Sequence, residues 1–75
     1  MDASADQMNA ILSLCGQFAE MRGHKVSEVL EAVLTTKTLK AMGHEYGLDA
    51  HLTAKQADAA MEILARWVEK ARELS

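Results

Sequence analysis

The residues of this chain best suited to metal binding or acid–base chemistry are its three histidines. His24 stands alone, whereas His44 and His51 bracket a segment that also carries two carboxylates, those of Glu45 and Asp49. Two histidine ligands on one helix need a spacing of i and i+4, but His44 and His51 are separated by a glycine-containing stretch that fixes no geometry. We therefore interpret this segment as a solvated acidic loop and expect no metal ion and no catalytic residue there.

Cys15 is the single cysteine and the other candidate for chemistry. A nucleophilic thiol needs a nearby base and an electropositive, accessible setting. Cys15 instead lies on an apolar helical stripe between Ile11 and Phe18, which is typical of an inert core residue. It has no partner for an internal disulfide, which favours a reducing compartment. Glycine-rich phosphate-binding and serine-hydrolase motifs are absent from the sequence. We expect no enzyme activity, no cofactor and no small-molecule substrate.

A basic segment offers the alternative of nucleic-acid binding. Residues 27–42 can be drawn as a short helix-turn-helix, with Lys37, Thr38 and Lys40 presented to DNA by the second helix. Residues 24–43 also form the only net-positive stretch of the chain. Against this interpretation stand a corner without glycine and a formal net charge of −3. A solvated lysine face explains the same residues, so DNA binding remains the alternative hypothesis.

Length and composition limit what the chain can build. Its 75 residues are 49% hydrophobic, but thirteen of them are alanine, which contributes little core volume. One modest core is expected, so residues 1–75 are predicted to form a single helical domain. The N-terminal segment is acidic where a secretory signal would be basic, and no apolar run is long enough to span a bilayer. We expect a cytoplasmic protein that does not bind membranes.

Helical periodicity covers most of the chain. It predicts an all-α fold, a small bundle of three to four helices at about 5–22, 28–34, 37–42 and 54–74. The first helix is expected to begin after Ser4 or Asp6 and to end at Gly23. Gly16 lies inside it at a cost of about 1 kcal/mol relative to alanine, which predicts the close approach of another helix backbone.

The middle and the last helix carry their own start signals. Ser27 is predicted to cap the second helix, and the threonines at 35 and 36 are predicted to break it, with a bent continuous helix as the rival interpretation. Thr53 and Gln56 match the capping-box pattern, which makes residue 54 the best-marked helix start in the sequence.

The last helix carries the surface that could serve a partner. Its apolar stripe includes Met61, Leu64, Trp67 and Val68. Such a stripe usually forms the core of the monomer, yet a small domain can also complete its core by binding a second chain. Tryptophan is enriched at interfaces because it offers a large contact area with few rotatable bonds.

Together these observations favour a small, non-enzymatic interaction or regulatory protein, of the accessory type found in bacteria and bacteriophages. It would bind a partner protein, or a second copy of itself, through apolar surface on its long helices around Trp67. The alternative is a DNA-binding regulator that uses residues 27–42.

Overall fold

The computed structural model of the chain describes residues 1–45 and 51–74, and all regular structure in them is helical apart from one isolated β-bridge. The four helices are α1 (Ala5–Arg22), α2 (Val26–Leu34), α3 (Lys37–Ala41) and α4 (Ala54–Leu74). They form a small bundle 37 Å long and 22 × 19 Å across. The predicted all-α fold is therefore confirmed, with helix ends within two residues of those expected.

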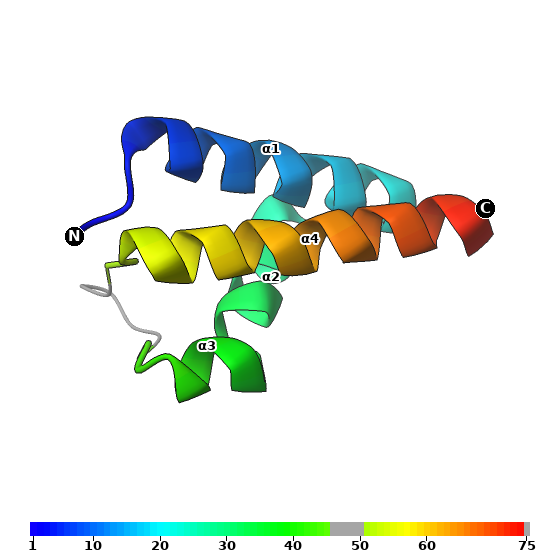
Figure 1. Cartoon of the computed structure of the whole chain (residues 1–75). Coiled ribbons are helices and arrows are strands. Elements are labelled where there is room, and N and C mark those ends of the chain that lie inside the picture. The colour runs from blue at the N-terminus through cyan, green and yellow to red at the C-terminus, as the bar shows by residue number, and fades with distance from the viewer. Residues whose placement is uncertain (46–50, 75) are drawn as a thin grey trace.

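The long helices α1 and α4 run side by side in the same direction and make the most extensive contact in the molecule (Figure 1). Their N-terminal ends are fastened together by the backbone: the Ala3 N–H donates to the Leu52 carbonyl at 2.9 Å, and the Ala54 N–H donates to the Met1 carbonyl at 2.8 Å. Because the helices are parallel, their C-terminal ends also lie together, at the opposite end of the bundle.

Both long helices begin at capping boxes. Ser4 caps α1: its N–H donates to Gln7 Oε1, and its Oγ accepts from the Gln7 N–H. Of the two expected start sites, Ser4 and Asp6, the helix therefore uses Ser4. At the start of α4, the Thr53 N–H donates to Gln56 Oε1 at 2.9 Å and the Gln56 N–H donates to Thr53 Oγ1 at 3.1 Å. The capping box predicted from Thr53 and Gln56 is confirmed.

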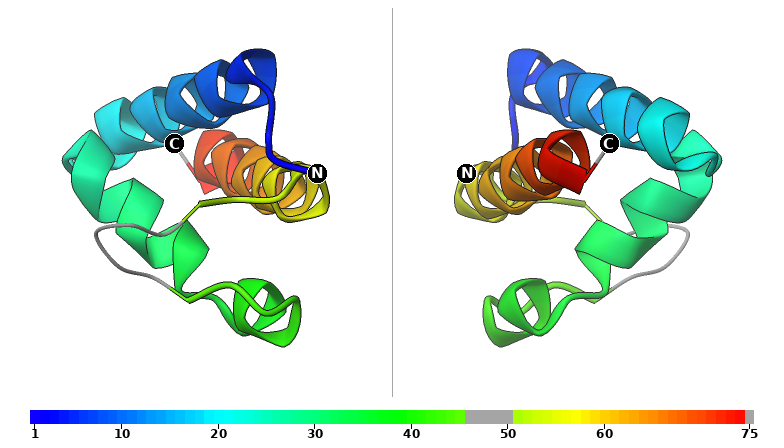
Figure 2. Two further views of the ribbon diagram at one scale, coloured as in Figure 1. Left: turned by 90° about the vertical axis from the view of Figure 1, so that its left-hand side faces the viewer. Right: turned by 90° about the vertical axis from the view of Figure 1, so that its right-hand side faces the viewer.

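Helices α2 and α3 cross from the end of α1 back toward the start of α4 (Figure 2). The expected break is confirmed, because α2 ends at Leu34 and Thr36 caps α3. The rival continuous helix is wrong. The prediction that Ser27 caps α2 is also wrong: the Glu28 carboxylate accepts the Lys25 N–H at 2.8 Å, and the helix begins at Val26.

The core lies where α1, α2 and α3 meet α4. Its largest fully buried side chains are those of Ile11, Cys15, Val33, Leu39 and Leu64. Buried Gln56 joins this core to α3, since its Nε2 donates to the Met42 carbonyl at 3.1 Å.

Gly16 does not mark a close helix contact. A Cβ placed on Gly16 would meet no atom within 4 Å. The predicted approach of another helix backbone is therefore wrong, and the glycine leaves a small space on α1. Gly23 and Gly43 differ, because their φ angles of 71° and 86° lie in the left-handed region that favours glycine. Gly23 terminates α1 as predicted.

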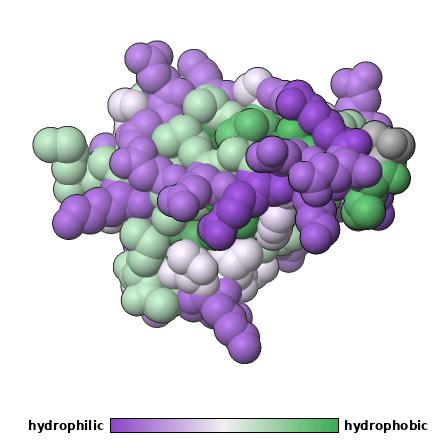
Figure 3. Space-filling view, turned by 45° about the vertical axis from the view of Figure 1, so that its right-hand side comes forward, coloured by the Kyte–Doolittle hydropathy of each residue, from purple (hydrophilic) through white to green (hydrophobic). Residues whose placement is uncertain are grey.

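The outer surface of the bundle mixes polar and apolar residues. On the face shown in Figure 3, hydrophobic surface is broken up by hydrophilic side chains. Among the described residues, none of the helices combines the length and the apolar character needed to cross a membrane.

Candidate functional site

An aromatic pair lies toward the C-terminal ends of the two long helices. The rings of Phe18 on α1 and Trp67 on α4 have centroids 5.7 Å apart and are tilted by 45°, a geometry favourable for aromatic pairs. Both side chains are only half-buried, although they pack against the core. The parallel arrangement of α1 and α4 thus places the only tryptophan and the only phenylalanine together at the surface.

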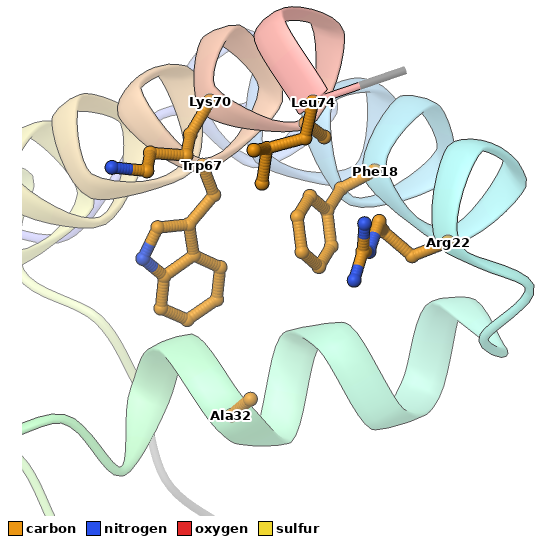
Figure 4. A pocket seen from close by; sticks show the side chains of 7 residues that line it. Phe18, Arg22, Ala32, Trp67, Lys70 and Leu74 are labelled. Carbon is orange, nitrogen blue, oxygen red and sulfur yellow. The ribbon is translucent and has the colours of Figure 1, made fainter.

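The pair lines an open groove between the ends of α1 and α4 and the side of α2 that carries Ala32. The groove has a volume of about 370 Å³, and its walls are mostly apolar (Figure 4). Ala32, exposed on α2, lies across the groove from the two rings. Leu74, on the last turn of α4, leaves 68% of its surface exposed. The complete lining consists of Phe18, Arg22, Ala32, Trp67, Lys70, Ala71 and Leu74.

A second recess continues the groove along α2. It shares Phe18, Ala32 and Trp67 with the first and has a volume of about 230 Å³. His24 stacks on the Phe18 ring at 6.3 Å between centroids, with an interplanar angle of 21°. Three aromatic side chains, those of Trp67, Phe18 and His24, therefore line the second recess, and Glu28 lies at its α2 edge.

Two cations border the apolar surface. In Figure 4 the Arg22 side chain lies beside Phe18, and Lys70 extends on the other side of Trp67. Both residues are exposed, and within residues 1–45 and 51–74 neither forms an ion pair or side-chain hydrogen bond. Arg22 lies in the last turn of α1, where a cation interacts favourably with the helix dipole. Neither cation has a carboxylate partner in the described part of the chain.

The four residues expected at an interface are placed in different environments. Leu64 and Val68 are buried at 0% and 4% exposure in the monomer, so they stabilise the core. Met61 is half-buried and packs against the core, while Trp67 alone of the four lines the groove. The groove residues that the sequence did not predict as interface residues are Phe18, Arg22, Ala32, Lys70, Ala71 and Leu74. Helical periodicity placed Phe18 on the apolar stripe of the first helix, but it did not predict that these residues meet, because it does not reveal how α2 is placed against the other helices.

The three residues proposed to contact DNA all lie on α3. Lys37, Thr38 and Lys40 are exposed, whereas Leu39 turns inward and is fully buried. The helix itself has five residues, which corresponds to about 7.5 Å of length. It therefore presents two cations and one hydroxyl over little more than one turn.

The histidines and the cysteine are not assembled into a site. In the described part of the chain, no group of three or more His, Cys, Asp or Glu side chains could hold a metal ion. His24 and His51 are exposed, whereas His44 is buried, contrary to the expected solvated loop, and its Nε2 has no hydrogen-bond partner among residues 1–45 and 51–74. Asp49 lies outside the described residues. Cys15 is fully buried, and this burial raises the pKa of its thiol from 9.0 to about 11, which keeps it protonated.

Comparisons with known proteins add no relative to this description: no protein-family model, no curated protein and no solved structure matches the chain. Arguments about function therefore depend on the groove and its residues alone.

Proposed function

We propose that this protein is a small helical interaction module that binds a helix of a partner protein in the groove beside Phe18 and Trp67. The half-buried aromatic pair at an open apolar groove is the observation that carries this proposal. Large apolar side chains that are only half-buried still expose apolar surface to water. A partner that covers this surface is stabilised by the hydrophobic effect. Aromatic residues in such positions commonly provide most of the binding energy of an interface.

The shape of the groove favours a helix as the occupant. Its walls are themselves formed by α1, α2 and α4 (Figure 4), so an additional helix can pack against them as neighbouring helices do in a bundle. An amphipathic helix places apolar side chains at i, i+3, i+4 and i+7 into such a groove. A small molecule, by contrast, is usually enclosed over about 70–90% of its surface, which an open groove does not provide.

A partner protein is favoured over a second copy of the chain. A two-fold symmetric dimer brings the same patch of both copies together. Arg22 and Lys70 of one copy would then face the cations of the other, and like charges across an interface oppose binding.

Site-specific photo-cross-linking tests the proposal in cells that express the protein. A photo-reactive p-benzoylphenylalanine replaces Ala32 in the groove or, as a matched control, Ala65, which is exposed on α4 and lines a separate recess on the Leu14 side of that helix. We expect a partner to be cross-linked from position 32 and not from position 65. The purified partner should then bind the chain at least about tenfold more weakly after Ala32→Glu, and with unchanged affinity after Ala65→Glu.

Two results would overturn the proposal. The first is equal cross-linking from both positions, or equal affinity of the captured protein for both glutamate variants. The second is a cross-linked dimer of the chain itself, which would replace the partner protein with a second copy.

A further inference from the structure

The groove combines two features that together restrict the chemistry of its occupant. Its floor is apolar, with Phe18 and Trp67 half-buried and Leu74 exposed. Its edges carry the side chains of Arg22 and Lys70, which have no acidic partner in residues 1–45 and 51–74. No acidic residue is among the described residues that line the groove, and Glu28 lines the smaller recess beside His24.

Resting on the proposed function, we infer that the partner segment is an acidic amphipathic helix. Its apolar face packs on Phe18, Trp67 and Leu74, and its carboxylates lie against Arg22 and Lys70. The two cations lie on opposite sides of the aromatic pair (Figure 4), so acidic side chains on both flanks of the apolar face can each meet a positive charge.

The charges around the groove make it selective for an acidic helix over a basic one. Charges at the rim of an interface mainly steer association and reject partners of the wrong sign. The chain as a whole carries a net charge of −3, which repels an acidic peptide everywhere except near local cations. An acidic helix is thereby directed to the groove, and a basic helix that could bind elsewhere on the acidic surface is disfavoured beside Arg22 and Lys70.

The inference is tested by selection from a displayed library of amphipathic helical peptides against the full chain. Apolar residues occupy i, i+3, i+4 and i+7 in every peptide, and the flanking positions are randomised among Glu, Gln, Ser and Lys. Peptides that bind the wild-type chain and the Ala65→Glu variant, but not the Ala32→Glu variant, are groove binders. We expect Glu to be enriched at the flanks of these peptides.

Reversing the charges of Arg22 and Lys70 then tests whether these two residues cause the preference for acidic peptides. We expect the selected peptides to bind the Arg22→Glu/Lys70→Glu protein about tenfold more weakly, and library selection on that variant to enrich Lys. The matched control is Lys55→Glu/Arg66→Glu, which reverses two exposed cations that do not line the groove. Its net charge is the same, so a purely global effect would weaken binding to both variants equally.

The outcomes separate this inference from the proposed function. Groove binders with neutral or basic flanks would overturn the acidic character of the partner while leaving a helix-binding groove. Equal loss of affinity in the two charge-reversed proteins would also overturn it. If no helical peptide binds in the groove, the inference fails even where cross-linking captures a partner at position 32. Groove-dependent binding of phosphatidylglycerol vesicles, with no groove-binding peptide, would assign the cations to a lipid surface and overturn it too.

Discussion

The ring of Trp67 lies 5.7 Å from the ring of Phe18, centroid to centroid, and joins the C-terminal halves of α4 and α1 at the edge of the groove. One face of each ring therefore contributes to packing while another part remains open to solvent. This double role is what distinguishes Trp67 from Leu64 and Val68 on the same helix, which are buried in the core.

Truncating Trp67 should cost less stability than truncating a core aromatic. We expect Trp67→Ala to lower the free energy of unfolding by about 1–2 kcal/mol, compared with about 3–5 kcal/mol for a fully buried ring. Trp67→Phe, which keeps an aromatic ring beside Phe18, should lose about half as much. Urea unfolding followed by far-UV circular dichroism measures both values. A loss above about 3 kcal/mol would place Trp67 in the core and remove it from the groove.

The sequence predicts those parts of the fold that depend on residues close together in the chain, and it does not predict contacts between different helices. The N-terminal starts of α1 and α4 are set by hydrogen bonds between residues three positions apart, such as Thr53 and Gln56. Such pairs can be recognised in the sequence. The start of α2 was missed because Glu28, not Ser27, supplies the local acceptor. The groove requires Phe18, Trp67 and Ala32 to meet from three helices. No local pattern specifies that meeting, because it depends on the angle at which α2 leaves α1.

Gln56 should be more important for stability than its equivalent in the first capping box. Its side chain accepts from the Thr53 N–H and donates to the Met42 carbonyl in a buried setting. Gln56→Ala removes both bonds and leaves that carbonyl without this donor, so we expect a loss of about 2 kcal/mol. Gln7→Ala also removes hydrogen bonds, one from the Ser4 N–H and two to the Ala54 carbonyl and the Asp58 carboxylate. Because Gln7 is less buried and water can replace its bonds, this substitution should cost only about 1 kcal/mol.

Hydrogen exchange locates the effect of Gln56. Because this side chain ties α4 to the end of α3, Gln56→Ala should accelerate amide exchange in α3 before it does so in α1. Uniform acceleration in all helices would contradict a specific role for the bond to Met42.

Alanine substitutions at two glycines of α1 should have opposite effects. Gly16→Ala meets no neighbouring atom and improves helix propensity, so it should stabilise the protein by about 1 kcal/mol, or about 5 °C in Tm. Gly23→Ala is equally free of contacts but forces a side chain into a φ of 71°, so it should destabilise by about 1 kcal/mol. Thermal unfolding measures both shifts. Destabilisation by Gly16→Ala would indicate a helix contact at that position.

Burial of Cys15 predicts a specific pH dependence. The thiol pKa is about 11 in the folded protein, raised from 9.0 by desolvation. Between these values the unfolded chain releases the proton and the folded protein retains it, so stability is lost as the pH rises. We expect this group to contribute a loss of about 1 kcal/mol between about pH 8 and pH 10. Cys15→Ala lacks the titrating thiol, and its stability should fall correspondingly less over the same range. Identical pH profiles for the two proteins would contradict the raised pKa.

Duplex DNA provides the test of the alternative function. Lys37 and Lys40 are exposed on a helix of five residues, and phosphate contacts from two lysines supply little affinity against a net charge of −3. We therefore expect only weak binding even at low salt, with a Kd above about 10 μM at physiological salt, in the range of non-specific association. Lys37→Ala/Lys40→Ala should change it no more than Lys55→Ala/Arg66→Ala, which removes two exposed cations from α4. Fluorescence anisotropy with labelled duplexes measures these affinities. Submicromolar binding that depends on Lys37 and Lys40 would make α3 the functional surface, because an effect that an equal charge change on α4 lacks means that the DNA contacts those two lysines directly.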